Sequence, residues 1–385
     1  MFNRLCLSLK LFGQETASID GSKFKADNSR NNQYTQKKTE EALSKLDKKA
    51  AEYLDELDRN DSAEDGEPHP DRKAIEEALE KISGRKSELE AILAEIKENG
   101  GSPICTVDED AALMKQSGGK GFDVCYNVQT SVDDKHGLIV EFNATNHGND
   151  MCELSDMVER TKEMLGVEKI NVLADTGYSN GEEIDKSEKA GATCFIPKAK
   201  PTRQPENEQF NRENFKYDAD NNTYTCPAGN TLPQVRTRER DGYKVYANRA
   251  ACKECPVKDQ CTKSQTLREI ERSPYQENVD RAAQNAKENP ALYQRRMELS
   301  EHPFGVVKRI WGYSQFLCRG KEMVTGEIAL AFLAFNLRRA VTILGVKKLV
   351  EAIQSGVLSL EYSFNSPKNT IIVMIKPLFH FTRLA

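Results

Sequence analysis

The sequence lacks a long hydrophobic run. Its longest near-continuous one, residues 328–335, is far shorter than the ~18 apolar residues that span a bilayer. A secretory leader is also missing, because Lys10 interrupts the short apolar patch near the N-terminus and no cleavage pattern follows it. Histidine is scarce, with five residues, and for His302, beside Glu301, a packing or surface role is the simpler interpretation. These absences argue against a membrane-spanning or secreted protein and predict a cytoplasmic one.

Disulfide bonds are not expected from the ten cysteines, because such bonds rarely persist in the cytoplasm. The cysteines therefore represent reduced thiols or metal ligands. Charged residues make up 30% of the chain, aromatic residues 7%, and the mean hydropathy is −0.66. This composition predicts a soluble chain that is not wholly disordered, and 385 residues correspond to two or three domains at ~150 residues each.

The formal net charge of −5 conceals an uneven distribution along the chain. Residues 41–100 hold 18 acidic and 10 basic side chains, whereas residues 291–345 hold eight Lys or Arg against four Glu. A local basic surface sets the field that a phosphate backbone meets, so the acidic net charge does not exclude a nucleic-acid partner.

Two segments carry apolar residues at helical spacing. They recur every three or four positions in residues 39–58, and in residues 71–98 they follow a heptad series that only Lys86 interrupts. An acidic segment with two prolines, residues 60–70, separates the two. The pattern predicts an antiparallel helical hairpin of the coiled-coil type, with its charges on a solvated face.

Elsewhere the apolar spacing changes to two, which is typical of strands. Residues 122–132 and 138–144 alternate in this way around a turn at 133–137, and residues 16–26 predict a short strand that ends in a turn after Asp20. Further along, the pattern predicts a helix, a buried strand, a short helix and another strand, at residues 154–164, 170–174, 181–190 and 193–196. The fold class is therefore α/β with a mixed sheet, from which the helical hairpin projects.

Three carboxylates stand out by their context. Asp20 closes the first predicted strand, Asp175 follows the most apolar one, and Glu301 lies between two basic clusters. Ser300 is a candidate helix cap, with Pro303 in the first turn. Three carboxylates from distant segments can bind two Mg²⁺ ions ~3.5–4 Å apart, the arrangement used for phosphoryl transfer. Alternatively each is structural, and Asp108, Asp110 and Asp150 are rival metal ligands, of which Asp110 would replace Asp20 if the first strand is wrongly assigned.

Four segments resemble the DDE transposases of bacterial insertion sequences, in the subgroup with a helical and a Cys-bearing insertion. They are IDGSKFKA (19–26), GFDVCYNVQTSVD (121–133), VLADTGYSNGEEI (172–184) and EHPFGVVKRIWGYSQFLCRGKE (301–322). The resemblance implies an RNase H-like, retroviral-integrase-like sheet in five parts: first strand and linker (1–38), helical hairpin (39–100), core strands and helices (101–197), Cys-bearing insertion (198–290) and C-terminal helices (291–385).

The resemblance further implies that Asp20, Asp175 and Glu301 are catalytic acids that bind two Mg²⁺ or Mn²⁺ ions. It implies a nucleoid-associated bacterial enzyme that cleaves element ends, joins them to target DNA and acts as a homodimer. DNA contacts are expected from residues near the last acid: Tyr293, Arg296, Lys308 and Arg309. Arg296 precedes Glu301 by one residue more than in the family signature. Because relatives carry a helical DNA-binding region before the first acid, and 19 residues precede Asp20, the resemblance also suggests a truncated copy.

Four cysteines in the predicted insertion, Cys226, Cys252, Cys255 and Cys261, have the spacing C-x25-C-x2-C-x5-C. A Cys-x2-Cys pair is a common half-site for tetrahedral Zn²⁺, although the other half-site matches less closely. Zinc binding and plain reduced thiols both remain open, and the other six cysteines are expected in the core. The alternative to a transposase is a non-catalytic remnant that acts only as a DNA- or protein-binding module.

Overall fold

The computed structural model describes residues 2–62, 72–116, 121–199 and 207–354. Within these ranges, a six-stranded mixed sheet runs in the order β4-β5-β1-β7-β8, with β6 also paired to β5. Strand β1 is antiparallel to β5 and parallel to β7, and β7 is parallel to β8. The strands are β1 (Thr16–Lys25), β4 (Ala112–Lys115), β5 (Phe122–Asp133), β6 (Ile139–Thr145), β7 (Ile170–Leu173) and β8 (Ala192–Phe195).

This mixed α/β arrangement agrees with the predicted mixed sheet and is compatible with a DDE or RNase H-like domain. The expectation that β1 ends in a turn after Asp20 is wrong, because the strand continues to Lys25. Its partner β5 is long enough to pair with it throughout, from Ala17 opposite Asp133 to Lys25 opposite Cys125. Continuous ladder hydrogen bonds thus hold Gly21 in the strand, where local preference alone favours a turn.

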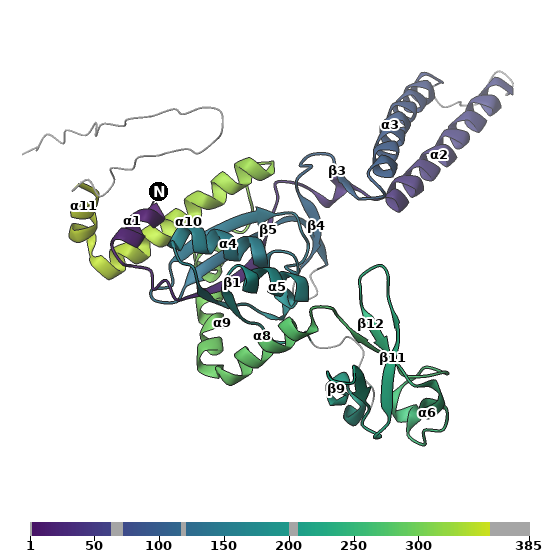
Figure 1. Cartoon of the computed structure of the whole chain (residues 1–385). Helices are drawn as coiled ribbons and strands as arrows, with labels where there is room; N and C mark the ends of the chain where they lie inside the picture. Colours follow the sequence, from purple (N-terminus) through teal and green to yellow (C-terminus); the bar gives the residue numbers. More distant parts are fainter. Residues whose placement is uncertain (1, 63–71, 117–120, 200–206, 355–385) are drawn as a thin grey trace, which may run out of the picture.

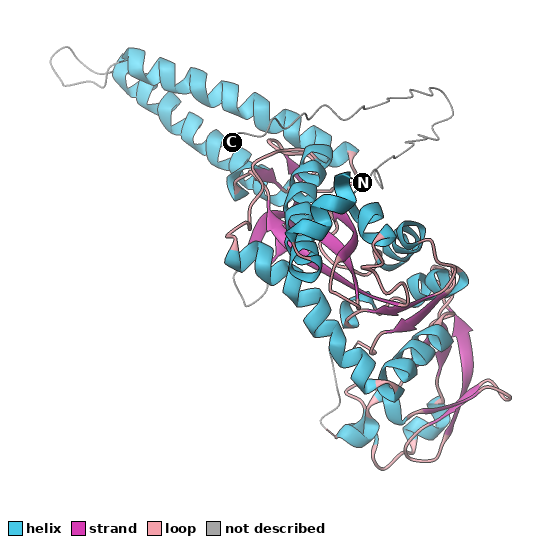
Figure 2. Cartoon of the chain, turned by 90° about the vertical axis from the view of Figure 1, so that its left-hand side faces the viewer, coloured by secondary structure: helices cyan, strands magenta, loops and turns pink. Residues whose placement is uncertain are grey.

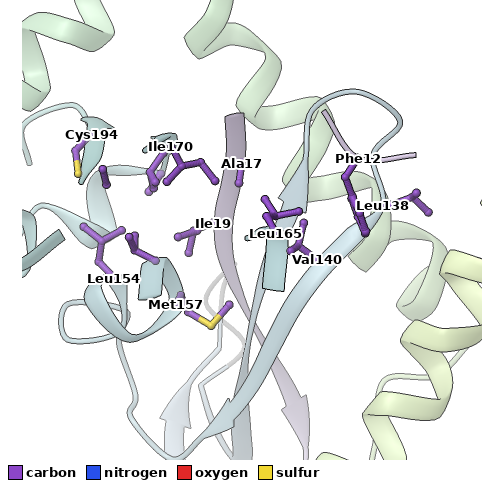
Figure 3. Close-up of a cluster of buried hydrophobic side chains, with 14 of the residues drawn as sticks. Phe12, Ala17, Ile19, Leu138, Val140, Leu154, Met157, Leu165, Ile170 and Cys194 are labelled. Atoms are coloured by element: carbon purple, nitrogen blue, oxygen red, sulfur yellow. The ribbon is translucent and has the colours of Figure 1, made fainter. Parts of the chain in front are cut away.

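Helices cover both faces of the sheet. On one face, Ala17 and Ile19 of β1 pack with Leu154 and Met157 in a buried cluster (Figure 3). On the other face, Phe24 and other β1 and β5 side chains pack against the C-terminal helices. The helices around this sheet are α1 (Phe2–Ser8), α4 (Leu154–Leu165), α5 (Gly181–Lys189), α8 (Gln276–Glu288), α9 (Pro290–Phe304), α10 (Lys321–Leu344) and α11 (Val346–Gln354).

Helices α2 (Gln36–Ser62) and α3 (Arg72–Glu98) lie side by side and project away from the sheet (Figure 1). Leu89 and Ile96 are buried between them, and Lys86 pairs with Asp47 at 2.7 Å across the two helices. Their bases are joined by the short strands β2 (Gln33–Tyr34) and β3 (Ile104–Cys105). The helical pair therefore matches the apolar spacing, while residues 63–71 of its acidic connection lie outside the described part.

A second sheet lies at the opposite end of the molecule from the helical pair (Figure 2). It has five strands in the order β13-β12-β11-β10-β9 within the described residues. The last helix of the predicted 198–290 part, α8, packs instead on β8 of the large sheet, where Asn285 Nδ2 donates to the Cys194 carbonyl at 3.1 Å. The elements are β9 (Lys216–Asp218), β10 (Thr223–Thr225), β11 (Thr231–Thr237), β12 (Lys244–Tyr246), α6 (Arg249–Lys253), α7 (Lys258–Cys261) and β13 (Ile270–Arg272).

In the described part of the chain, single turns of 3₁₀-helix connect these elements at Arg30–Asn32, Thr176–Tyr178, Glu208–Phe210 and Arg212–Asn214. Among the described residues, no single helix is long and apolar enough to cross a membrane; α10 and α11 together pass that test by length and composition, but they meet at a 110° bend.

The prediction that Ser300 caps the start of a helix, with Pro303 in the first turn, is wrong. Helix α9 runs through both residues, and the Ser300 hydroxyl donates to the Arg296 carbonyl at 2.8 Å. A proline inside a helix cannot donate its backbone hydrogen bond and crowds the preceding turn. Directly after it, Gly305–Ile310 form a π-helix, a wider turn of the kind that often marks functional sites.

Candidate active site

Two of the predicted catalytic acids meet at one edge of the large sheet. Strands β1 and β7 are parallel neighbours, with Ser18 paired to Leu173. Asp20 and Asp175 each lie two residues beyond this last paired position, so the parallel register carries both to the same end of the sheet. The carboxyl end of a strand such as β7 is where α/β folds place their sites, and β1 continues past this point to Lys25.

The two carboxylates are held in different ways. Asp20 is largely buried in the middle of β1, where its Oδ1 accepts from the Gly21 amide at 2.9 Å and where Ser300 of α9 lies close enough to influence its charge. Asp175 caps the short helical turn after β7, and its Oδ1 accepts from the Gly177 amide at 2.7 Å. Both side chains are therefore oriented by backbone and helix contacts before any ligand arrives.

The electrostatics of Asp20 are unusual for a surface aspartate. The pKa of Asp20 is raised from 3.8 to about 6, mainly by burial and next by the negative charge of Asp175. The Gly21 amide, the Arg296 guanidinium and the Ser300 hydroxyl act against this rise in the pKa. Strongly raised carboxylate pKa values of this kind are typical of functional sites, because an uncompensated like charge costs stability.

Replacing Asp20 with asparagine should therefore stabilise the ion-free protein at pH 8. The pKa of Asp20 is about 6 in the folded protein, above its unfolded value of 3.8, so the folded state favours the protonated carboxyl. Asp20 therefore contributes most to the free energy of unfolding below pH ~4, and this contribution is lost as the pH rises to ~6. At pH 8 the variant should gain about 2 kcal/mol in the free energy of unfolding, measured by urea denaturation with EDTA, and little at pH 4. Asp156→Asn, on the exposed start of α4, is the matched control; an unchanged or lower stability of Asp20→Asn at pH 8 would contradict the assigned repulsion.

Glu301, the third predicted acid, lies one residue beyond Ser300 on α9. A step of one residue turns a helix by about 100°, so Glu301 leaves the face that contacts Asp20, and its side chain is exposed. Among the described residues, no three His, Cys, Asp or Glu side chains are arranged to hold a metal ion. The structure thus brings Asp20 and Asp175 together without a third acid already in place. The neighbouring His302 has a packing role, because its ring lies edge-on to that of Phe335 with the ring centres 5.5 Å apart.

Tyr293 and Arg296 lie on the face of α9 that covers the two aspartates. The Tyr293 hydroxyl donates to the carbonyl of Ala174 at 3.3 Å, directly before Asp175. The Arg296 guanidinium lies 5.9 Å from the Tyr293 ring and acts on the charge of Asp20. Both residues are therefore neighbours of the acid pair; their predicted contacts with DNA remain a prediction.

Lys308 extends from the π-helix toward β1. Its Nζ donates to the Ser22 hydroxyl and the Lys23 carbonyl, both at 2.6 Å, and lies 4.2 Å from the Phe24 ring centre. Burial lowers the pKa of this amine to about 8. In this structure Lys308 thus anchors the strand segment just after Asp20, whereas the adjacent Arg309 is exposed; the DNA contacts of both residues stay predictions.

Asp150, predicted only as a rival metal ligand, lies close to the acid pair. Asp150 Oδ1 accepts from Asn127 Nδ2 at 2.8 Å and Gln129 Nε2 at 2.7 Å, and the side chain lies against Gly21. The other two rivals serve the start of α10: Asp108 accepts from the Gly320 amide and Asp110 from that of Lys321. The sequence signal for Asp150 was the alternation of Asn127 and Gln129 in β5, because the amide side chains of both residues bind this carboxylate.

The four cysteines of the predicted insertion gather at one place, as linings of a cavity of about 30 Å³ beside the second sheet. The Asn230 amide donates to Cys226 Sγ at 3.3 Å, and burial raises the pKa of Cys261. All ten cysteines are free thiols. The core expectation for the remaining six is wrong for Cys152, which is exposed, and for Cys318, which is half-buried, because both lie in loop segments beside the packed elements.

Comparison with known proteins gives one family. Residues 225–341 match the model of a transposase DDE domain, a range that contains the four gathered cysteines, Glu301 and Lys308 but not Asp20 or Asp175. Neither the curated proteins nor the solved structures contain a match to this chain. Of the four sequence segments that resemble these transposases, the match contains the last, residues 301–322. Over residues 225–341, therefore, this chain is similar to the transposase DDE domain.

Proposed function

We propose that this protein is a DDE transposase that cleaves phosphodiester bonds of DNA and joins the freed 3′ end to a target. The observation that carries the proposal is the meeting of Asp20 and Asp175, which lie on different strands and are far apart in sequence. Two carboxylates held this close raise each other's free energy unless a cation offsets their charge. The raised pKa of Asp20 supports a site that is built for such a cation.

The surroundings of Asp175 fit a divalent metal ion. A methyl group on Gly177 would lie 2.9 Å from Asp175 Oδ1 and 3.7 Å from Asp150 Oδ2, so glycine keeps the space beside both carboxylates open. Oxygen ligands of this kind suit Mg²⁺ and Mn²⁺. When bound, such ions supply positive charge that favours ionisation of the attacking oxygen and stabilises the leaving oxygen.

The residues of the chain would share the remaining work. Asp20 and Asp175 hold the cations, while Ser300 and Arg296 position Asp20 from α9. Glu301 is the third acid that the resemblance implies, and we expect a turn of its exposed side chain to bring it toward the pair. Phosphate binding by Arg309 fits its exposure, and charge attraction to DNA fits the basic excess of residues 291–345.

The remaining parts of the chain take supporting roles in this proposal. The core comprises residues 1–38, 101–197 and 291–385, of which 355–385 lie outside the described residues. The helical hairpin (39–100) and the Cys-bearing part (198–290) are insertions into it. The partners are element ends, target DNA and a second copy of the chain. The four cysteines line one cavity without forming a ready metal-binding group in this structure, and they would hold a structural zinc ion once their sulfur atoms draw together.

Metal-dependent nicking of supercoiled plasmid DNA tests the proposed activity. We expect the purified full chain to convert plasmid to the nicked form with Mg²⁺ or Mn²⁺ and to lose this activity in EDTA, because the acid pair needs a cation. A gel-shift assay on the same DNA measures binding separately. DNA binding without nicking under either ion would contradict the proposal and favour the non-catalytic remnant, which the lack of a ready-made three-acid group among the described residues also favours.

A further inference from the structure

We propose that Asp150 is a fourth acid of the site, which binds one divalent cation jointly with Asp175 beside Gly177. This inference rests on the proposed function, because it assigns a further ligand for the cations of that site. It differs from the three-acid expectation in naming a residue from the segment before α4, on the face of β1 opposite Asp20.

The position of Asp150 follows from the strand geometry. Side chains alternate between the two faces of a strand, so Asp20 points toward α9 and the next position, Gly21, toward α4. A side chain at Gly21 would collide with Asp150 and Gln129. Beyond the Ser18–Leu173 pair, β1 has no β7 partner, so Asp175 sits where both faces of β1 can be reached.

A buried hydrogen-bond network orients Asp150. Asn127 and Gln129, both fully buried, donate their side-chain amides to the same oxygen, Oδ1. Gln129 in turn accepts from the hydroxyl of buried Tyr178. Among the described residues, the structure shows no hydrogen-bond donor on Oδ2, the oxygen that faces the space beside Gly177. The network therefore fixes one carboxylate oxygen and leaves the other directed at the space that Asp175 shares.

The charges around this space point to a cation. Burial raises the pKa of Tyr178, in the turn after Asp175, and the negative charges of Asp150, Asp20 and Asp175 raise it in the same direction. Mg²⁺ commonly keeps several water ligands and binds only one or two protein carboxylates, so the pair formed by Asp150 and Asp175 suffices for one ion. Asp175 would then be shared between this cation and the one that Asp20 helps to hold.

Mn²⁺ binding by the full-length chain tests this inference without reference to cleavage. The free Mn²⁺ signal in electron paramagnetic resonance is followed during titration of the ion-free protein at pH 8. Asp150→Asn keeps the oxygen that Asn127 and Gln129 bind but replaces the facing oxygen by an amide, so affinity for one ion should fall about tenfold or more. Gly177→Ala keeps every acid but fills the space between them, so it should lower the affinity for the same ion.

The control is Asp156→Asn, which removes the same charge from the exposed start of α4 and should bind Mn²⁺ as the wild-type protein does. Titration curves for Asp150→Asn and Gly177→Ala that coincide with the wild-type curve would overturn the assignment of Asp150 while leaving the proposed function intact. A wild-type protein that binds no Mn²⁺ at millimolar concentration would overturn the proposed function itself.

Discussion

Replacing Asp20 or Asp175 by asparagine should lower metal-dependent DNA nicking by about a thousandfold or more. Asparagine keeps the local hydrogen bonds, since its carbonyl oxygen still accepts from the Gly21 or Gly177 amide. What it removes is the negative charge that holds a divalent ion, and the loss of such charge stabilisation amounts to about 4 kcal/mol in the transition state. Initial rates of plasmid nicking with Mg²⁺ and Mn²⁺ give the comparison.

Folding and DNA binding serve as internal controls for these variants. Asp20→Asn should melt at a higher temperature than the wild-type protein at pH 8, so lost activity cannot be attributed to unfolding. Asp156→Asn should nick DNA at the wild-type rate. Retention of more than about a tenth of the activity by both Asp20→Asn and Asp175→Asn would show that the acid pair is not the catalytic site.

The Glu301→Gln variant tests whether Glu301 is the third catalytic acid that the resemblance implies. A loss as large as that of Asp175→Asn means that Glu301 turns inward in the active complex. An active Glu301→Gln variant instead excludes it as the third acid.

The largest expected effect on stability concerns the gathered cysteines. Zinc should be present at about one equivalent in protein that is purified without chelators, and Cys252→Ser or Cys255→Ser should reduce it below half an equivalent. The second sheet has a small core, in which Phe215, Tyr224, Leu232, Tyr246 and Ile270 are buried. Cores of this size rarely stabilise a fold alone and commonly depend on a metal or another cross-link.

Elemental analysis measures the zinc, and near-ultraviolet circular dichroism follows the second sheet, where the Tyr217 and Tyr224 rings lie 5.0 Å apart. Removal of zinc should abolish most of this tyrosine signal before the large sheet unfolds, because zinc binding contributes on the order of 10 kcal/mol in small metal-dependent folds. Cys152→Ser, at an exposed cysteine away from this cavity, is the control. Folded wild-type protein with less than half an equivalent of zinc would establish plain thiols instead.

The local elements and part of the site could be read directly from the sequence. Alternation in residues 122–132 and 138–144 predicted β5 and β6, and apolar spacing predicted α2 and α3, because each pattern reflects which side chains a regular element can bury on one face. Asp175 was found in the same way, from its place after a buried strand. The spacing of the four cysteines left zinc binding and plain thiols both open, and the structure places all four around one small cavity; zinc binding stays a prediction.

Only the tertiary structure decided the features that depend on partners far away in the chain. Pairing with β5 holds Gly21 in a strand, although its local preference is for a turn, and the parallel register of β1 and β7 brings Asp20 beside Asp175. The π-helix after Pro303 directs Lys308 to β1. Asp150 became a site residue because buried amides from β5 orient it. Propensity and periodicity act over a few residues. These contacts depend instead on strand register and on packing between different elements, some of them more than a hundred residues apart, so no local pattern encodes them.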